Sequence, residues 1–149
     1  MKNLKKLFSV LLVLVLSLFA INTFANETVK GSITVNKTVE GKVYDIYKIF
    51  DLTYSGSNVA YTIDADWNGF FFGENAIGKD YIVDVNSGSL NQITVDGTTK
   101  YINITDANIV EFTQNALEYA RGVTADDSKT AAGTSLVFND LALGYYLVY

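Results

Sequence analysis

The sequence predicts a mainly β fold, an antiparallel β-sandwich with one inserted α-helix over about residues 106–121. Apolar and polar residues alternate in several short segments, most clearly in Gly41–Tyr54, where β-branched and aromatic side chains dominate. Turn-forming residues, mainly glycine, asparagine, serine and aspartate, separate these segments. A helical spacing of apolar residues is clear only in Ile109–Ala120. Short strands joined by turns are typical of a sandwich.

Residues 1–25 have the pattern of a secretory signal peptide. Three lysines precede an apolar run, Leu7–Phe19, and Thr23-Phe24-Ala25 supplies small residues of the kind that a signal peptidase recognises. We expect cleavage between Ala25 and Asn26. The alternative is a retained membrane anchor, but the run is shorter than the roughly 20 residues that a spanning helix needs. The mature, secreted domain is therefore expected to comprise residues 26–149.

Charge and composition exclude several classes of function. Three of the 11 basic residues lie in the leader, so 8 basic side chains remain against 16 acidic ones, a net charge of −8. This charge argues against nucleic acid and anionic membranes as partners. The chain has no cysteine and no histidine, which excludes disulfides, catalytic Ser-His or Cys-His pairs and histidine- or cysteine-based zinc sites. We expect no cofactor and no enzymatic activity.

Two lysines lie on otherwise apolar faces of the first predicted strands. In residues 32–39, Lys37 has the same parity as three apolar side chains. In the next strand, Lys48 shares its face with Ile46 and Phe50. A lysine directed into a core must extend to water, form an ion pair or lose its charge.

Residues 64–78 are irregular and rich in aromatic side chains, namely Trp67, Phe70, Phe71 and Phe72. One interpretation is that this stretch plugs one end of the core, and the other is an exposed contact surface. We favour the plug, because large exposed apolar patches are uncommon on monomers. The segment Asp64–Gly69 is similar to the start of an EF-hand calcium loop, but Asn75 stands where such a loop needs glutamate. No metal site is therefore predicted.

The remaining elements follow from local patterns. Asp96-Gly97 between two β-prone runs predicts a hairpin. Residues 123–133 are small and polar and predict a loop, and Asn139-Asp140 predicts a bend. The predicted strands are residues 32–39, 41–54, 59–63, 80–85, 92–95, 98–104, 135–138 and 145–149.

Several strings, in this order, resemble one protein family. They are G-S-I-T-V from Gly31, G-K-V-Y-D-I-Y-K-I-F-D-L-T-Y-S-G from Gly41, A-Y-T-I-D before Trp67, A-L-E-Y-A at the end of the helix, and F-N-D-L-A-L-G-Y-Y-L-V from Phe138. Together they resemble the N-terminal domain of Gram-positive, sortase-assembled, isopeptide-forming pilins (fimbrial subunits). The resemblance covers nearly all of residues 26–149.

The resemblance implies an immunoglobulin-like sandwich and a structural subunit of a cell-surface pilus that is involved in adhesion. It implies location in the Gram-positive cell wall, with other pilin subunits and sortase as partners. A full pilin also carries a pilin-motif lysine, further sandwich domains and a C-terminal sorting signal, and the sequence contains none of them. We therefore expect the chain to be the first module of such a protein, incomplete at its C-terminal end.

The resemblance also implies candidate residues for an internal isopeptide bond, in which a lysine on an early strand joins an asparagine on a late strand, aided by a buried acid. Burial makes such a lysine a better nucleophile. The candidate lysines are Lys48 and Lys37, and the candidate acids are Glu111, Glu118 and Asp45. The asparagine is expected after Tyr149, with Asn139 as the late alternative. The competing interpretation, which we favour, is that both lysines keep their charged ends in water on an edge strand.

A second class of function is an adhesin module. In this interpretation Trp67 and the three phenylalanines bind a host protein or glycan at the surface. A secreted hydrolase would have to use paired carboxylates, Asp64 with Asp66 or Asp126 with Asp127, and neither pair has a supporting constellation.

Overall fold

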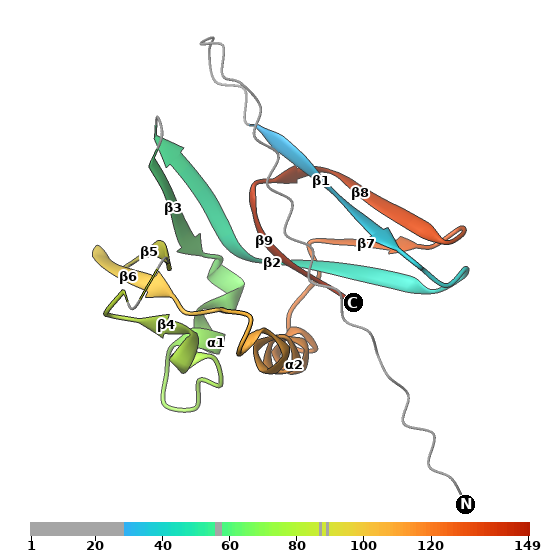
Figure 1. Ribbon diagram of the computed structural model, residues 1–149. Helices are drawn as coiled ribbons and strands as arrows, with labels where there is room; N and C mark the ends of the chain where they lie inside the picture. Colours follow the sequence, from blue (N-terminus) through green and yellow to red (C-terminus); the bar gives the residue numbers. More distant parts are fainter. Residues whose placement is uncertain (1–28, 56–57, 87, 89) are drawn as a thin grey trace, which may run out of the picture.

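The computed structural model describes residues 29–149 except 56, 57, 87 and 89 (Figure 1). The expected cleavage site, Ala25–Asn26, lies outside the described residues. The described part confirms the predicted class: it is mainly β, with two sheets and one helix of appreciable length.

The long strand β2 (Val43–Ser55) pairs with three other strands of the larger sheet (Figure 1). Its first residues pair with β7 (Asp127–Thr130), its middle with β9 (Gly144–Val148) and its last residues with β3 (Asn58–Ile63), all antiparallel. β7 falls inside residues 123–133, so the prediction of a loop there was wrong. Its sequence Asp-Ser-Lys-Thr is polar and carries no alternation, and only pairing with β2 makes it a strand.

A β-bulge changes the face on which the side chains of β2 lie. The pairing with β9 shifts register between Lys48 and Phe50. Tyr47, Ile49 and Phe50 therefore all belong to the main hydrophobic core, whereas Ile46 packs against the smaller sheet. The prediction that Phe50 shares a face with Ile46 and Lys48 was wrong, because an extra residue in one strand reverses the parity beyond it.

The smaller sheet pairs β1 (Lys30–Asn36) with β8 (Ser135–Ala142). It packs on β2 and β9 through a second hydrophobic cluster made of Ile33, Val35, Ile46, Phe138, Tyr146 and Val148. β1 ends before Lys37, which is exposed and has a φ of 60°. Lys37 therefore keeps its charged end in water, as the favoured interpretation expected, but it lies just beyond the strand and not on it. β8 continues through Asn139-Asp140, where a bend was predicted. Its pairing with β1 shifts register at this point, and Asp140 has a φ of 58°.

The second half of the larger sheet consists of β4 (Ile82–Val83), β6 (Thr98–Ile102) and β5 (Asn91–Val95), and β5 joins β3 by a short parallel contact. The predicted hairpin is confirmed: Val95 pairs with Thr98, and Asp96 and Gly97 both have positive φ, as a two-residue primed turn requires. Within the strand predicted over residues 80–85, only Ile82 and Val83 form a strand, β4, which directly follows a 3-10 turn, η2 (Lys79–Tyr81).

The predicted helix is confirmed as α2 (Ile109–Ala120). Its buried side chains, Phe112, Thr113, Ala116 and Ala120, face the core. Beside it lie η1 (Ala65–Trp67) and the short α1 (Asn68–Phe71), which carry Trp67, Phe70 and Phe71 into the same core (Figure 1).

Candidate functional site

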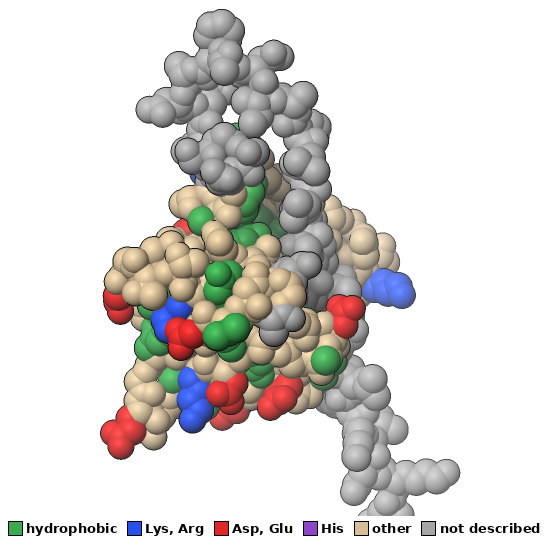
Figure 2. Space-filling view, turned by 60° about the vertical axis from the view of Figure 1, so that its left-hand side comes forward, with side chains coloured by type: hydrophobic (Ala, Val, Ile, Leu, Met, Phe, Trp, Pro, Cys, Tyr) green, Lys and Arg blue, Asp and Glu red, His purple; other side chains and the backbone are tan. Residues whose placement is uncertain are grey.

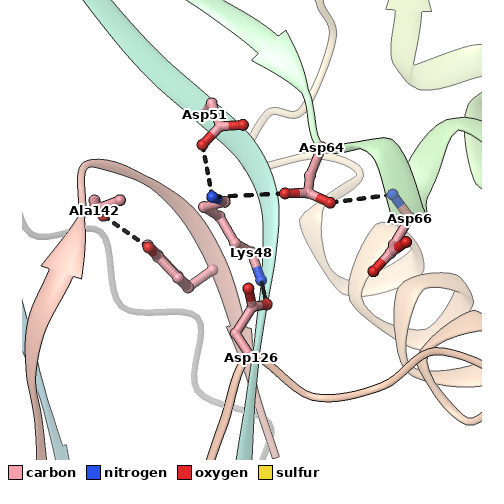
Figure 3. A network of polar contacts seen from close by, with 7 residues as sticks. Lys48, Asp51, Asp64, Asp66, Asp126 and Ala142 are labelled. Atoms are coloured by element: carbon pink, nitrogen blue, oxygen red, sulfur yellow. Dashed lines mark hydrogen bonds and ion pairs between the residues drawn. The ribbon is translucent and has the colours of Figure 1, made fainter.

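Lys48 lies at the centre of a polar cluster on β2 (Figure 3). Its Nζ is 2.7 Å from Oδ1 of Asp51 and 3.6 Å from Oδ2 of Asp64, and its side chain is only 18% exposed. Asp64 follows β3 and also caps η1, since its Oδ1 accepts a hydrogen bond from the backbone N–H of Asp66 at 3.1 Å. The lysine on the apolar face therefore keeps its charge by pairing.

Asp126 completes the cluster from the other side of Lys48 (Figure 3). Along β2, the pairing with β7 ends at Ile46 and the pairing with β3 begins at Phe50. The backbone N–H of Lys48 falls between them and donates to Oδ2 of Asp126 at 2.7 Å. The carboxylate thus replaces a strand as the partner of this N–H group.

The electrostatics of the cluster keep the lysine protonated. The hydrogen bond to Asp51 raises the pKa of Lys48, against the lowering effect of desolvation. Desolvation raises the pKa of Asp126, and the charges of Asp64 and Asp66 add to this. A lysine with a raised pKa is a weak nucleophile near neutral pH, so the arrangement favours a structural ion pair over amide formation.

The acids expected beside Lys48 lie elsewhere. Glu111 and Glu118 are exposed on α2, and Asp45 accepts a hydrogen bond from Ser128 Oγ at 2.6 Å. Among the described residues, the carboxylates paired with Lys48 Nζ are those of Asp51 and Asp64 instead. We expected Lys48 to lie on an edge strand with its charged end in water. This was wrong, because β2 has neighbouring strands on both sides.

The asparagine alternative is placed on the smaller sheet. Asn139 is exposed on β8, next to Phe138, whose side chain is fully buried in the second cluster. Successive side chains of a strand point to opposite faces, so Asn139 is directed away from the core that Phe138 fills.

The sequence contained only weak signals for Asp51, Asp64 and Asp126. Asp51 lies three positions from Lys48, and an undisturbed strand would put the two on opposite faces. The bulge between them changes that relation. Asp126 is 78 positions away from Lys48 and reaches it only through strand pairing.

The aromatic stretch lies in the core. Trp67, Phe70 and Phe71 are at most 1% exposed, and Phe72 alone of the four is exposed, at 37%. Phe70 contacts Trp67, Tyr81, Phe112 and Tyr119 with ring centroids 5.4 to 6.5 Å apart. These positions agree with the interpretation of the stretch as a plug. In Figure 2, hydrophobic side chains appear at several places on the face shown, between polar and charged ones.

No group of three or more acidic side chains suited to a metal ion occurs in the part of the chain that the structure describes. No helix among the described residues is long and apolar enough to span a membrane. Comparisons with protein-family models, with curated proteins and with solved structures find no match to this chain.

Proposed function

We propose that the chain is a structural subunit, or the N-terminal module of one, of a Gram-positive cell-surface pilus involved in adhesion. The observation that carries the proposal is the ordered set of pilin-like strings, from G-K-V-Y-D-I-Y-K-I-F to F-N-D-L-A-L-G-Y-Y-L-V. The mainly β fold with its single long helix supports it, as does the leader-like composition of residues 1–25.

The polar cluster has a mechanical role in this proposal. A pilus subunit is pulled along its length, and β2 is paired with three different strands. Lys48, Asp51, Asp64 and Asp126 tie β2 to the segments that follow β3 and precede β7. Such ion pairs resist separation of the strands but, unlike an isopeptide bond, they re-form after rupture.

Fractionation of the cells that encode the chain tests the proposal. An antiserum against residues 29–149 should detect the gene product in the cell-wall fraction, as a ladder of high-mass species that survives boiling in detergent. Deletion of the sortase genes should collapse the ladder to one band. A product confined to the cytosol, or a single wall-free band in the parent strain, contradicts the pilus proposal.

The adhesin module with an aromatic contact loop receives no comparable support. Three of its four proposed contact residues, Trp67, Phe70 and Phe71, are core side chains. A binding surface would have to be sought elsewhere on the molecule.

A further inference from the structure

A hollow of about 590 Å³ opens between η1 and the C-terminal end of α2. It is lined by Asp66, Ile77, Glu118, Tyr119, Gly122, Val123 and Thr124. Its volume lies within the range of roughly 300–1,000 Å³ that is typical of ligand pockets. Neither the polar cluster at Lys48 nor the proposed pilus function uses it.

The wall of the hollow that contains Tyr119 is held in place. The Tyr119 hydroxyl donates to the backbone oxygen of Asp66 at 3.1 Å, and its ring lies 5.3 Å from the buried ring of Trp67. Gly69 makes this contact possible, because a Cβ there would be 2.8 Å from the hydroxyl. The tyrosine therefore links α2 to η1 and presents a preformed surface.

The charges that line the hollow are of one sign. Asp66 and Glu118 are its only charged lining residues, and neither forms an ion pair within the described part of the chain. Arg121, three positions after Glu118, is exposed and not part of the lining. Ile77, which is 47% exposed, and Val123 add apolar surface beside the two carboxylates.

We propose that this hollow binds a basic side chain, a lysine or arginine, of a partner protein. The cationic head would lie between the carboxylates of Asp66 and Glu118, and the aliphatic stem would cover Ile77 and Val123. A tyrosine ring in the wall adds favourable surface for a cation. A partner of opposite charge also suits a chain with a net charge of −5 over its full length.

Peptide titration followed by amide NMR tests the proposal on the purified chain. The probe is acetyl-Gly-Lys-Gly-amide, and the matched neutral peptide has norleucine in place of lysine. We expect saturable shifts of the amides of Ile77, Tyr119 and Gly122–Thr124 with the lysine peptide, weakening as salt is added. The norleucine peptide should bind at least tenfold more weakly.

Two substitutions on the same helix separate a specific site from general attraction. Glu118→Gln should weaken lysine-peptide binding roughly five- to tenfold, in line with the loss of one charge-assisted contact. Glu111→Gln removes the same charge from α2 outside the hollow and should leave binding unchanged. Unchanged amide spectra away from the hollow show that both variants remain folded.

Three outcomes would overturn the proposal. Equal binding of the lysine and norleucine peptides would mean an apolar site. Equal weakening by the two substitutions, or by neither, would mean diffuse attraction to an acidic surface. Stronger shifts of the same amides with N-acetylglucosamine than with the lysine peptide would assign the hollow to a glycan. None of these three outcomes affects the cell-wall fractionation that tests the pilus proposal, so the two proposals can fail separately.

Discussion

At the scale of single residues, Lys48 shows how a charged side chain is accommodated on an otherwise apolar face. Its ammonium group is paired with Asp51 and Asp64, and its backbone N–H is bound by Asp126. Desolvation alone would lower its pKa, and the carboxylates reverse this effect. Removal of the lysine leaves these carboxylates close together without a counter-charge.

We expect Lys48→Met to lower the free energy of unfolding by about 1–2 kcal/mol at neutral pH, between the values for exposed and buried pairs. Because the pKa of Lys48 is raised, this contribution is present below its ordinary value of 10.5 and is lost as the pH rises through the raised value. Urea denaturation at several pH values measures it. Lys100→Met is the control, since its partner Asp84 is 77% exposed; an equal loss in both variants would contradict the prediction.

The second residue-scale prediction concerns covalent linkage. Lys48 is held as an ammonium, Lys37 is exposed beyond β1, and Asn139 is exposed on β8. We therefore expect the purified chain to contain no internal Lys–Asn bond, which would need a neutral lysine next to an asparagine. Intact-mass spectrometry decides this, because each bond expels one ammonia. A uniform loss of ammonia that maps to either lysine and Asn139 would be the contrary result.

At the scale of elements, β2 depends on a side chain where its strand partner changes. Asp126 accepts the N–H of Lys48 between the β7 and β3 pairings. We expect Asp126→Ala to speed hydrogen exchange of the Lys48 amide roughly two- to tenfold, the effect of about 0.5–1.5 kcal/mol for one hydrogen bond. Asp126→Asn keeps an oxygen acceptor and should retain most of the protection. Equal exchange in all three proteins would show that the carboxylate is not the partner in solution.

The pH dependence of stability in the parent chain and in Asp126→Asn tests the pKa of Asp126. Its pKa is raised above 3.8, so folding favours the protonated carboxyl. The contribution of this group to stability therefore increases as the pH falls through the raised pKa and decreases above it. Compared with Asp126→Asn, the parent chain should gain stability on acidification over this window.

The first residue of β9, Gly144, lies so close to β2 that a larger residue does not fit there. A Cβ on Gly144 would lie 2.2 Å from the backbone oxygen of Phe50, which cannot move without disturbing β2. We expect Gly144→Ala to destabilise the fold by about 1–3 kcal/mol, as overpacking does. Gly133→Ala is the matched control, since nothing lies within 4 Å of the position that its new methyl group would occupy. Thermal unfolding compares the two, and similar midpoints would refute the prediction.

At the scale of the whole molecule, stability rests on the aromatic core between the larger sheet and α2. Phe70 is fully buried among five other aromatic rings, whereas Phe72 is 37% exposed. We expect Phe70→Ala to cost about 3–5 kcal/mol and Phe72→Ala to remain within about 1 kcal/mol. The emission of Trp67, the single tryptophan, can be used to follow the unfolding of both variants. Because Trp67 is buried, its emission in the folded chain should be blue-shifted and resistant to quenching by acrylamide. Ready quenching of Trp67 would support a surface role instead.

Local sequence patterns were sufficient to predict the elements whose signal spans a few residues. The alternation in β2 and the helical spacing of α2 are short-range repeats, the Asp96-Gly97 hairpin is a two-residue turn signal, and the structure contains all three. The large apolar side chains of Trp67 and Phe70 likewise predicted a position in the core, and both are buried there. Burial of apolar side chains is enough to select the strand, the helix and the position of the aromatic stretch, whereas residues that accept a positive φ select the hairpin.

Features that depend on distant partners were settled only by the tertiary structure. β7 is a strand because its backbone pairs with β2. Asp126 accepts the backbone N–H of Lys48 although the two residues are 78 positions apart in the sequence. A single bulge on β2 exchanges the faces beyond it and brings Phe50 into the main core. Local patterns cannot encode these outcomes, because one extra residue in a strand reverses side-chain parity and because ion-pair partners are chosen by strand pairing.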